Sequence, residues 1–186
     1  MVTLPARRPA TYADIVALPE NVVGEIVNGE LVVSPRPAPR HATVTSSLGG
    51  ILVPPYRFGD GGPGGWQILD EPELHLGDDV LVPDLAGWRS ERLPSVPEEA
   101  YFTLPPDWVC EVLSPSTSRV DRTRKLPIYA RAAVPYAWLI DPATQTLEVY
   151  RLESGHWMVV ATHGGDEQVR AVPFDAIELD LSRLWA

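Results

Sequence analysis

The sequence predicts one α/β domain built around a mixed β-sheet. Two observations favour this fold class: short apolar segments typical of strands alternate with segments of helical spacing, and the linkers between them are too short to separate two domains. Apolar residues make up 45% of the 186 residues, enough for one substantial core. We therefore expect residues 1–186 to form a single domain, with residues 1–10 as a loose lead-in.

Helices are expected where apolar residues recur at three- and four-residue steps beside capping and breaking residues. Thr11 can cap the first helix, Pro54-Pro55 should end the second, and Ser116 or Thr117 can cap the third. The predicted helices span residues 12–18, 41–53 and the segment that runs from 117 toward 133.

Strands are expected where short apolar segments lie between turn residues. Asn28-Gly29 is the strongest kind of two-residue hairpin signal, so the strands on either side of it should pair antiparallel. The last three strands should be successive antiparallel neighbours joined by glycine-containing turns. The predicted strands span residues 22–27, 30–34, 66–69, 74–76, 80–88, 108–113, 136–140, 147–152, 157–162 and 168–172.

The charge and cysteine content limit the class of protein. A net charge of −10 argues against a protein that coats nucleic acid, but not against a nuclease, because local arginines and a divalent cation can offset phosphate charge. No apolar segment is long enough for a membrane span, and the N-terminus does not resemble a secretory signal. The single cysteine, Cys110, excludes an internal disulfide, so we expect a cytoplasmic protein.

Two carboxylates interrupt apolar strands, Asp84 in one and Glu111 in another. A charge in such a place is costly unless it meets a cation, backbone donors or a metal. Adjacent strands could bring both carboxylates to one point, where they would suit a hard cation such as Mg²⁺. The alternative is that each acid lies at a strand end and pairs with an arginine.

Lys125 is the only lysine among the 15 Lys and Arg side chains. Asp121, Lys125 and Tyr129 follow at four-residue steps, which places them on one face of the third predicted helix. Lys125 could reach the carboxylate pair and stabilise the charge of a phosphoryl transition state. It could instead form a surface pair with Asp121. Pro127 affects this choice, because it should kink the helix or begin a new one, which would leave Lys125 on a loop.

These residues also occur in the order of a known family. The matching segments are Glu25-x-x-Asn28-Gly29-Glu30-Leu31, Ser34-Pro35, His41, Pro83-Asp84, Glu111-Val112-Leu113-Ser114-Pro115-Ser116-Thr117, Asp121-x-x-x-Lys125, Tyr129 and Tyr136-x-Trp138-Leu139-Ile140-Asp141-Pro142. Over roughly residues 10–160 this pattern resembles the Uma-two family of candidate restriction endonucleases, in the PD-(D/E)XK nuclease superfamily. The block that begins at Glu111, with the downstream aspartate and lysine, is its most specific part.

The resemblance implies a restriction-endonuclease-like core of helix, three strands, helix and strand, to which the hairpin and the C-terminal strands are added. Asp84 matches the aspartate of the PD motif and Glu111 the acid of the (D/E)XK motif, and both would hold Mg²⁺, with Mn²⁺ as a substitute. The lysine usual in the superfamily would fall at Leu113, so the resemblance assigns its role to Lys125 on the following helix.

His41 is expected as a further catalytic residue, and Glu25 and Asp121 receive supporting roles. His41 could line the site and help to activate water, or pack on a neighbouring loop. Glu25 could be an outer-shell ligand or a solvent-facing strand residue, and Asp121 should orient Lys125. Several arginines could contact phosphates, namely Arg36, Arg40, Arg119, Arg122 and Arg124.

The implied function is a Mg²⁺-dependent endonuclease that acts on DNA. A homodimer is expected, with the apolar C-terminal strands as the interface. The alternative is a catalytically inactive binding or scaffold module on the same fold. A lysine that points to solvent, or carboxylates too far apart to share a cation, would favour the module.

Overall fold

The computed structural model describes residues 8–185, so most of the predicted lead-in lies outside the described residues. The strands are β1 (Val22–Val27), β2 (Glu30–Pro35), β3 (Trp66–Asp70), β4 (Leu74–Leu76), β5 (Asp79–Leu81), β6 (Leu85–Arg89), β7 (Trp108–Val112), β8 (Tyr136–Asp141), β9 (Thr146–Glu153), β10 (His156–Gly164), β11 (Gln168–Val169) and β12 (Leu179–Asp180). The helices are α1 (Tyr12–Val16), α2 (Pro39–Val53), α3 (Ser118–Val120) and α4 (Leu126–Arg131), with π-helical turns η1 (Pro54–Phe58) and η2 (Asp121–Lys125) and a 3₁₀ turn η3 (Leu181–Leu184).

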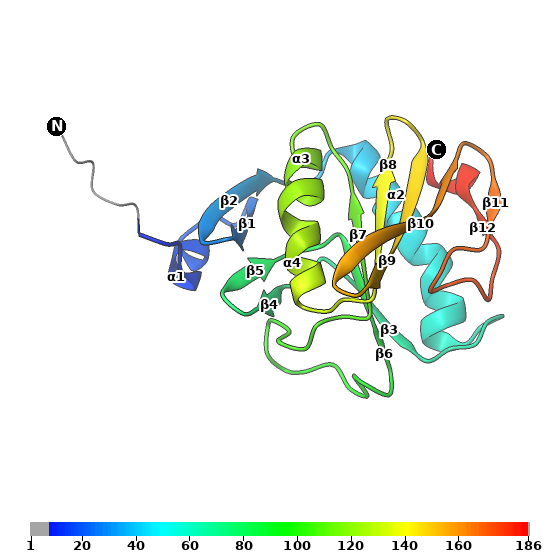
Figure 1. The fold of residues 1–186 in the computed structure, drawn as a ribbon, viewed down its shortest axis with the longest axis horizontal. Helices are drawn as coiled ribbons and strands as arrows, with labels where there is room; N and C mark the ends of the chain where they lie inside the picture. The colour runs from blue at the N-terminus through cyan, green and yellow to red at the C-terminus, as the bar shows by residue number, and fades with distance from the viewer. Residues whose placement is uncertain (1–7, 186) are drawn as a thin grey trace.

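A mixed six-stranded sheet in the order β10-β9-β8-β7-β6-β3 forms the centre of the molecule. Its strands pair antiparallel except for β7 and β8, which are parallel and are joined by the helical segment α3–η2–α4. The hairpin β1–β2 and the small sheet β11–β12 lie at opposite ends of the molecule (Figure 1). The chain order α2, β3, β6, β7, helical segment, β8 confirms the predicted core of helix, three strands, helix and strand.

The two faces of this sheet are covered by different helices. Along β7, Trp108, Cys110 and Val112 belong to the apolar cluster under α2, whereas Val109 belongs to the cluster under α4. Because side chains alternate between the faces of a strand, Glu111 points to the same side as Val109. The alternation of β7 therefore directs this glutamate toward the segment that carries Lys125.

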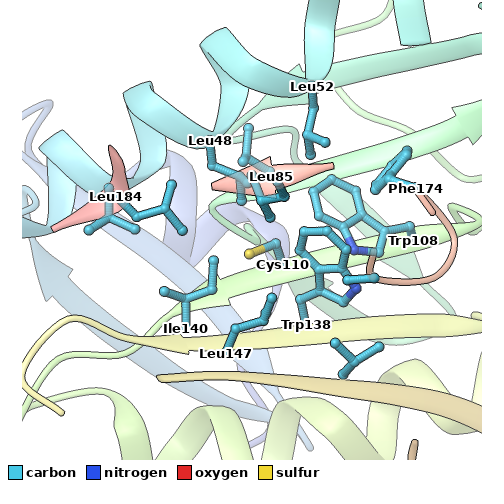
Figure 2. Close-up of a cluster of buried hydrophobic side chains, with 14 of the residues drawn as sticks. Leu48, Leu52, Leu85, Trp108, Cys110, Trp138, Ile140, Leu147, Phe174 and Leu184 are labelled. Carbon is cyan, nitrogen blue, oxygen red and sulfur yellow. The ribbon is translucent and has the colours of Figure 1, made fainter. Parts of the chain in front are cut away.

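The core under α2 is dense and aromatic. Figure 2 shows Leu48 and Leu52 of α2 lying over Trp108 and Cys110 of β7, with Phe174 beside them. The Phe174 ring centroid lies 4.8 Å from that of Trp108. Burial raises the pKa of the Cys110 thiol well above its ordinary value, as expected for an inert core thiol. None of the helices in residues 8–185 has the length and apolar character that a membrane crossing requires.

The single strand predicted over 80–88 is wrong, because the structure divides it. β5 belongs to the four-stranded sheet β2-β1-β5-β4 and β6 to the central sheet, and the chain passes from one to the other at Val82, Pro83 and Asp84. Pro83 has no N–H to donate to a strand ladder, so pairing is interrupted there. Asp84 consequently lies immediately before a strand and not within one.

The regular α-helix α2 ends at Val53, as predicted, but the predicted start at residue 41 is two residues late. The second helix begins at Pro39, which the first turn tolerates, and it continues through Pro54-Pro55 as the wider turn η1. The backbone hydrogen bonds at the end of this turn are formed, because the carbonyl of Pro54 accepts the N–H groups of Gly59 and Asp60. The hydroxyl of buried Tyr56 also accepts two backbone N–H groups from the C-terminal segment, which holds the turn against the core.

The strand predicted over 168–172 is shorter and has a different partner. Only Gln168–Val169 is extended in a ladder, and it pairs with Leu179–Asp180 instead of β10. Ala171 and Phe174 leave this ladder to enter the aromatic core, where both are buried. The burial of these two side chains ends the strand after Val169, and the apolar pattern of the sequence alone does not show this.

Candidate active site

Asp84 lies where β5 gives way to β6, and both of its carboxylate oxygens have partners. Oδ2 accepts the backbone N–H of Val112 at 2.7 Å, and Oδ1 lies 3.2 Å from Nε2 of His41. The side chain is 15% exposed. The break at Pro83 thus frees Asp84 from the ladder and lets it bind to the end of β7 beside Glu111.

Glu111 is buried, with its side chain 4% exposed, and it is contacted from the helical segment. Its Oε1 lies 2.8 Å from Nζ of Lys125 and accepts the hydroxyl of Tyr129 at 2.6 Å. Burial raises the pKa of Glu111 well above its ordinary value; the charge of Lys125 opposes this, while the charges of Asp121 and Asp84 add to it. These contacts engage Oε1 and leave Oε2 for a further ligand.

Lys125 lies at the centre of the acidic groups. Its Nζ is 2.9 Å from Oε1 of Glu25 and 3.8 Å from Oδ1 of Asp121, and it also donates to the carbonyl of Val82 at 3.4 Å. Burial alone would lower the pKa of Lys125, but the charges of Glu111 and Glu25 raise it well above its ordinary value, so the ammonium stays charged. The interpretation of Lys125 as part of a surface pair is wrong, because its side chain is only 4% exposed.

The π-helical turn η2 lets the helical segment contain both Lys125 and Pro127. Pro127 occupies the second position of α4, where its missing N–H costs little, and the N–H of Leu126 reaches back five residues to the carbonyl of Asp121. The helical backbone therefore continues from Ser118 to Arg131 without a loop. Lys125 therefore lies on a helical turn and not on a loop, and it keeps its contacts with Glu25 and Glu111.

Glu25 and Asp121 complete the surroundings of the ammonium. Glu25, in β1, is buried, and its Oε1 also accepts the backbone N–H of Val82 at 2.8 Å. The alternative of a solvent-facing Glu25 is therefore wrong. Asp121 is buried as well, and burial raises its pKa to about 6 although the charge of Lys125 lowers it.

His41 is the third residue of α2 and reaches Asp84 through Nε2. Its Nδ1 is buried and has no hydrogen-bond partner within residues 8–185. Burial lowers the pKa of His41, but the hydrogen bond and charge of Asp84 outweigh burial and raise it above its ordinary value. The imidazole thus packs against a proposed ligand, and not merely against a loop.

Tyr129 has a position that sequence reasoning did not assign. It is fully buried, and burial together with the charge of Glu111 raises its pKa well above its ordinary value. The phenol therefore stays protonated and donates a hydrogen bond to Glu111. The available signal was its place four residues after Lys125 on the same helical face. The spacing alone does not show where β7 lies relative to the helix, so it could not predict the contact between Tyr129 and Glu111.

Glu71 was also missed. It lines the same cavity as Asp84, and its backbone N–H donates to the carbonyl of Asp84 at 3.0 Å. Its φ of 43° lies in the left-handed region, which is uncommon for a residue other than glycine. Oε2 of Glu71 lies 4.0 Å from Nη1 of Arg36 at the rim. The local sequence carries no signal for this backbone conformation.

All of the predicted site residues line one cavity of about 250 Å³. They are Glu25, His41, Asp84, Glu111, Asp121 and Lys125. With Glu71, five acidic side chains line this cavity against three basic ones, Arg36, His41 and Lys125, so acidic groups are in excess there. Such an excess in a buried place favours a bound cation.

The donor set fits a hard divalent cation only in part. Asp84 and Glu111 offer carboxylate oxygens to the cavity, the donors that Mg²⁺ prefers. Within residues 8–185, however, no three His, Cys, Asp or Glu side chains are grouped closely enough to form a metal site by themselves. A site with only two carboxylates is compatible with Mg²⁺, which usually binds through one or two carboxylates and keeps waters and substrate oxygens as its other ligands.

Comparison with known proteins gives a consistent result. No protein of curated function matches the chain. A solved structure titled as a "putative nuclease belonging to DUF820" from Anabaena variabilis superposes with a TM-score of 0.72 and 25% sequence identity, covering 95% of this chain and 98% of that one. The family model described as "Putative restriction endonuclease", Uma2, matches residues 11–182. The chain therefore belongs to the Uma2 family.

Proposed function

We propose that the chain is a metal-dependent endonuclease that hydrolyses phosphodiester bonds of DNA. The observation that carries this proposal is a charged lysine buried between two glutamates, in a cavity that also contains Asp84. The family description and the nuclease title of the structural relative support it. The burial of Lys125 also supports the enzyme over an inactive binding module, for which a solvent-facing lysine would be expected.

In this proposal Asp84 and Glu111 hold one Mg²⁺, or Mn²⁺ in its place. The cation supplies Lewis-acid stabilisation of the phosphate and lowers the pKa of the attacking water. The backbone N–H of Val112 fixes Asp84, and the hydroxyl of Tyr129 fixes Glu111. Both carboxylates are thereby oriented before any ligand enters, which reduces the reorganisation needed at the moment of reaction.

Lys125 stabilises the negative charge that grows on the phosphate oxygens in the transition state. Glu25 and Asp121 keep its ammonium charged and limit its movement, with Glu25 in turn held by the N–H of Val82. His41 is held by Asp84 and supplies a protonatable nitrogen at the cavity, which would help to activate water.

The proposal includes a homodimer and a cytoplasmic location. β10 is an edge strand of the central sheet, and Met158, Val159 and Val160 on it are exposed apolar side chains. Unpaired backbone groups on such an edge can pair with a second copy of the same strand. The lone buried thiol of Cys110 suits a reducing compartment.

The decisive test is DNA cleavage by purified protein with Mg²⁺ or Mn²⁺, comparing the wild type with Asp84→Asn. This change removes the charge but keeps an oxygen to accept the N–H of Val112, so the fold should persist. We expect a loss of at least about a hundredfold. Asp107→Asn is the matched control, because Asp107 is a similarly buried aspartate that lies outside the cavity and binds Arg92.

The control should cleave at the wild-type rate. Absence of cleavage of any DNA form with either cation, together with no heat of Mn²⁺ binding in calorimetry, would contradict the proposal.

A further inference from the structure

A groove of about 360 Å³ continues from the cavity and has no role in the chemistry described above. The two share Ala38, His41, Ser114 and Pro115, so they adjoin along these residues. The groove runs between the start of α2 and the turn after β8, where Asp141 and Pro142 lie. A ligand in the cavity therefore has an adjoining groove into which it can extend.

The groove has the chemical character of a site for one nucleotide. Leu113, Pro115 and Pro142 give it rigid apolar walls, which suit a sugar or a base. Arg40 is exposed at its edge and supplies a positive charge for a phosphate. Asp141 is the one acid of its lining, and Oδ1 of this residue is already engaged by the N–H groups of Ala143 and Thr144.

The catalytic groups can be reached only from within the cavity. The side chains of Glu111 and Lys125 are each 4% exposed, so a phosphodiester must enter the cavity to meet them. In a duplex each phosphate belongs to a stiff, stacked backbone, whereas a single strand can bend at every nucleotide. Enzymes that act on a base recessed in a duplex use single strands or extruded nucleotides, and a phosphodiester that must enter a narrow cavity sets a comparable requirement.

The surface charge also disfavours a duplex. Of the five arginines proposed as phosphate ligands, Arg122 forms an ion pair with Glu148 and Arg124 with Glu30. Of the other three, Arg36 lines the cavity, with Glu71 4.0 Å from it, Arg40 lines the groove, and the exposed Arg119 lines neither. On a chain with a net charge of −10, two arginines can serve the few phosphates of one strand but not the backbone of a duplex.

We propose that cavity and groove form one track for single-stranded DNA, in which Arg40 binds the phosphate next to the scissile one. This inference rests on the proposed nuclease function and specifies its substrate. Two phosphate contacts give a shallow salt dependence, so Kd for a single strand should rise only about sevenfold between 50 and 200 mM salt. A duplex held through six or more phosphates would lose about a thousandfold over the same range.

The test compares one labelled oligonucleotide sequence as a single strand and as a blunt duplex. Binding is measured by fluorescence anisotropy with Ca²⁺, and cleavage with Mn²⁺, for wild type, Arg40→Ala and Arg151→Ala. Arg151 is the matched control, because it pairs in register with Tyr136, at the opposite end of β8 from the groove. We expect at least tenfold preference for the single strand in both assays, and at least fivefold weaker binding for Arg40→Ala alone.

Equal or better binding or cleavage of the duplex would overturn the inference, as would an equal effect of the two arginine substitutions. Absence of binding to either form would overturn it too. Binding of the single strand without cleavage of either form would support the track and contradict the nuclease proposal, so the two failures are distinguishable.

Discussion

Replacing Lys125 by methionine tests whether the buried acids of the cavity depend on one cation for the stability of the fold. Methionine is unbranched and one atom shorter than lysine, so it keeps most of the apolar packing, but it removes the charge that Glu25, Glu111 and Asp121 share. Removing one partner of a buried ion pair costs about 3–5 kcal/mol, because the remaining charge is left uncompensated. Near pH 8 we expect a loss of unfolding free energy in that range.

The loss should depend on pH, and its sign follows from Asp121. Burial raises the pKa of Asp121 to about 6, and Lys125 is the main influence that lowers it, so its removal raises the pKa further. An acid with a higher pKa in the folded state than in the unfolded chain binds its proton more strongly when folded. Folding is therefore favoured as the pH falls through the window between the two values. The penalty should be full near pH 8 and shrink toward pH 5.

The assay is urea unfolding followed by tryptophan fluorescence, with EDTA present, for wild type and Lys125→Met at both pH values. The six tryptophans, four of them fully buried, give a strong signal. Arg151→Met is the control for loss of a half-exposed cation, and it should change the unfolding free energy by less than about 0.5 kcal/mol. A loss below about 1 kcal/mol for Lys125→Met at pH 8, or a loss that does not shrink in acid, would refute the reasoning.

Three further outcomes are expected. Tyr129→Phe removes the donor to the buried glutamate, so it should cost about 1–2 kcal/mol in urea unfolding and weaken Mn²⁺ binding in calorimetry; an unchanged affinity for Mn²⁺ would exclude the orienting role. Arg122 and Tyr150 lower the pKa of Glu148. The extra unfolding free energy of wild type over Arg122→Gln should therefore be present near pH 7 and disappear as the pH falls below the ordinary carboxylate range. A difference in unfolding free energy that persists in acid would contradict this. In metal-free protein the pKa of His41, measured by NMR, should lie above its ordinary value. It should fall in Asp84→Asn, because burial is then opposed only by the smaller influences of Val112 and Asp121.

The sequence predicted best those features that depend on local pattern. Asn28-Gly29 does form the turn of the β1–β2 hairpin, and both residues have the positive φ that such a turn needs. The alternation of β7 and the four-residue steps from Asp121 were enough to suggest that Glu111 and Lys125 meet. These features repeat regularly along the chain, so a single sequence reveals them.

Features that depend on a distant partner could not be predicted. Pro83 divides a continuous apolar segment between two sheets, and the pattern on either side gives no sign of a change of sheet. Tyr129 acquires its partner only through the parallel crossover from β7 to β8. The short strand Gln168–Val169 pairs with the chain terminus because Phe174 is drawn into the aromatic core. In each case tertiary burial outweighs the local preference.

The widened turn η2 makes Pro127 important for the site although it does not line the cavity. An alanine at this position could donate the backbone hydrogen bond to Thr123 that proline cannot, which would allow a regular α-helix in place of the wide turn. Each residue of an α-helix turns by about 100°, so closing the wide turn would rotate Lys125 away from Glu111. A more regular helix would thus be gained at the expense of the charge arrangement, which makes Pro127 a position where stability and activity oppose each other.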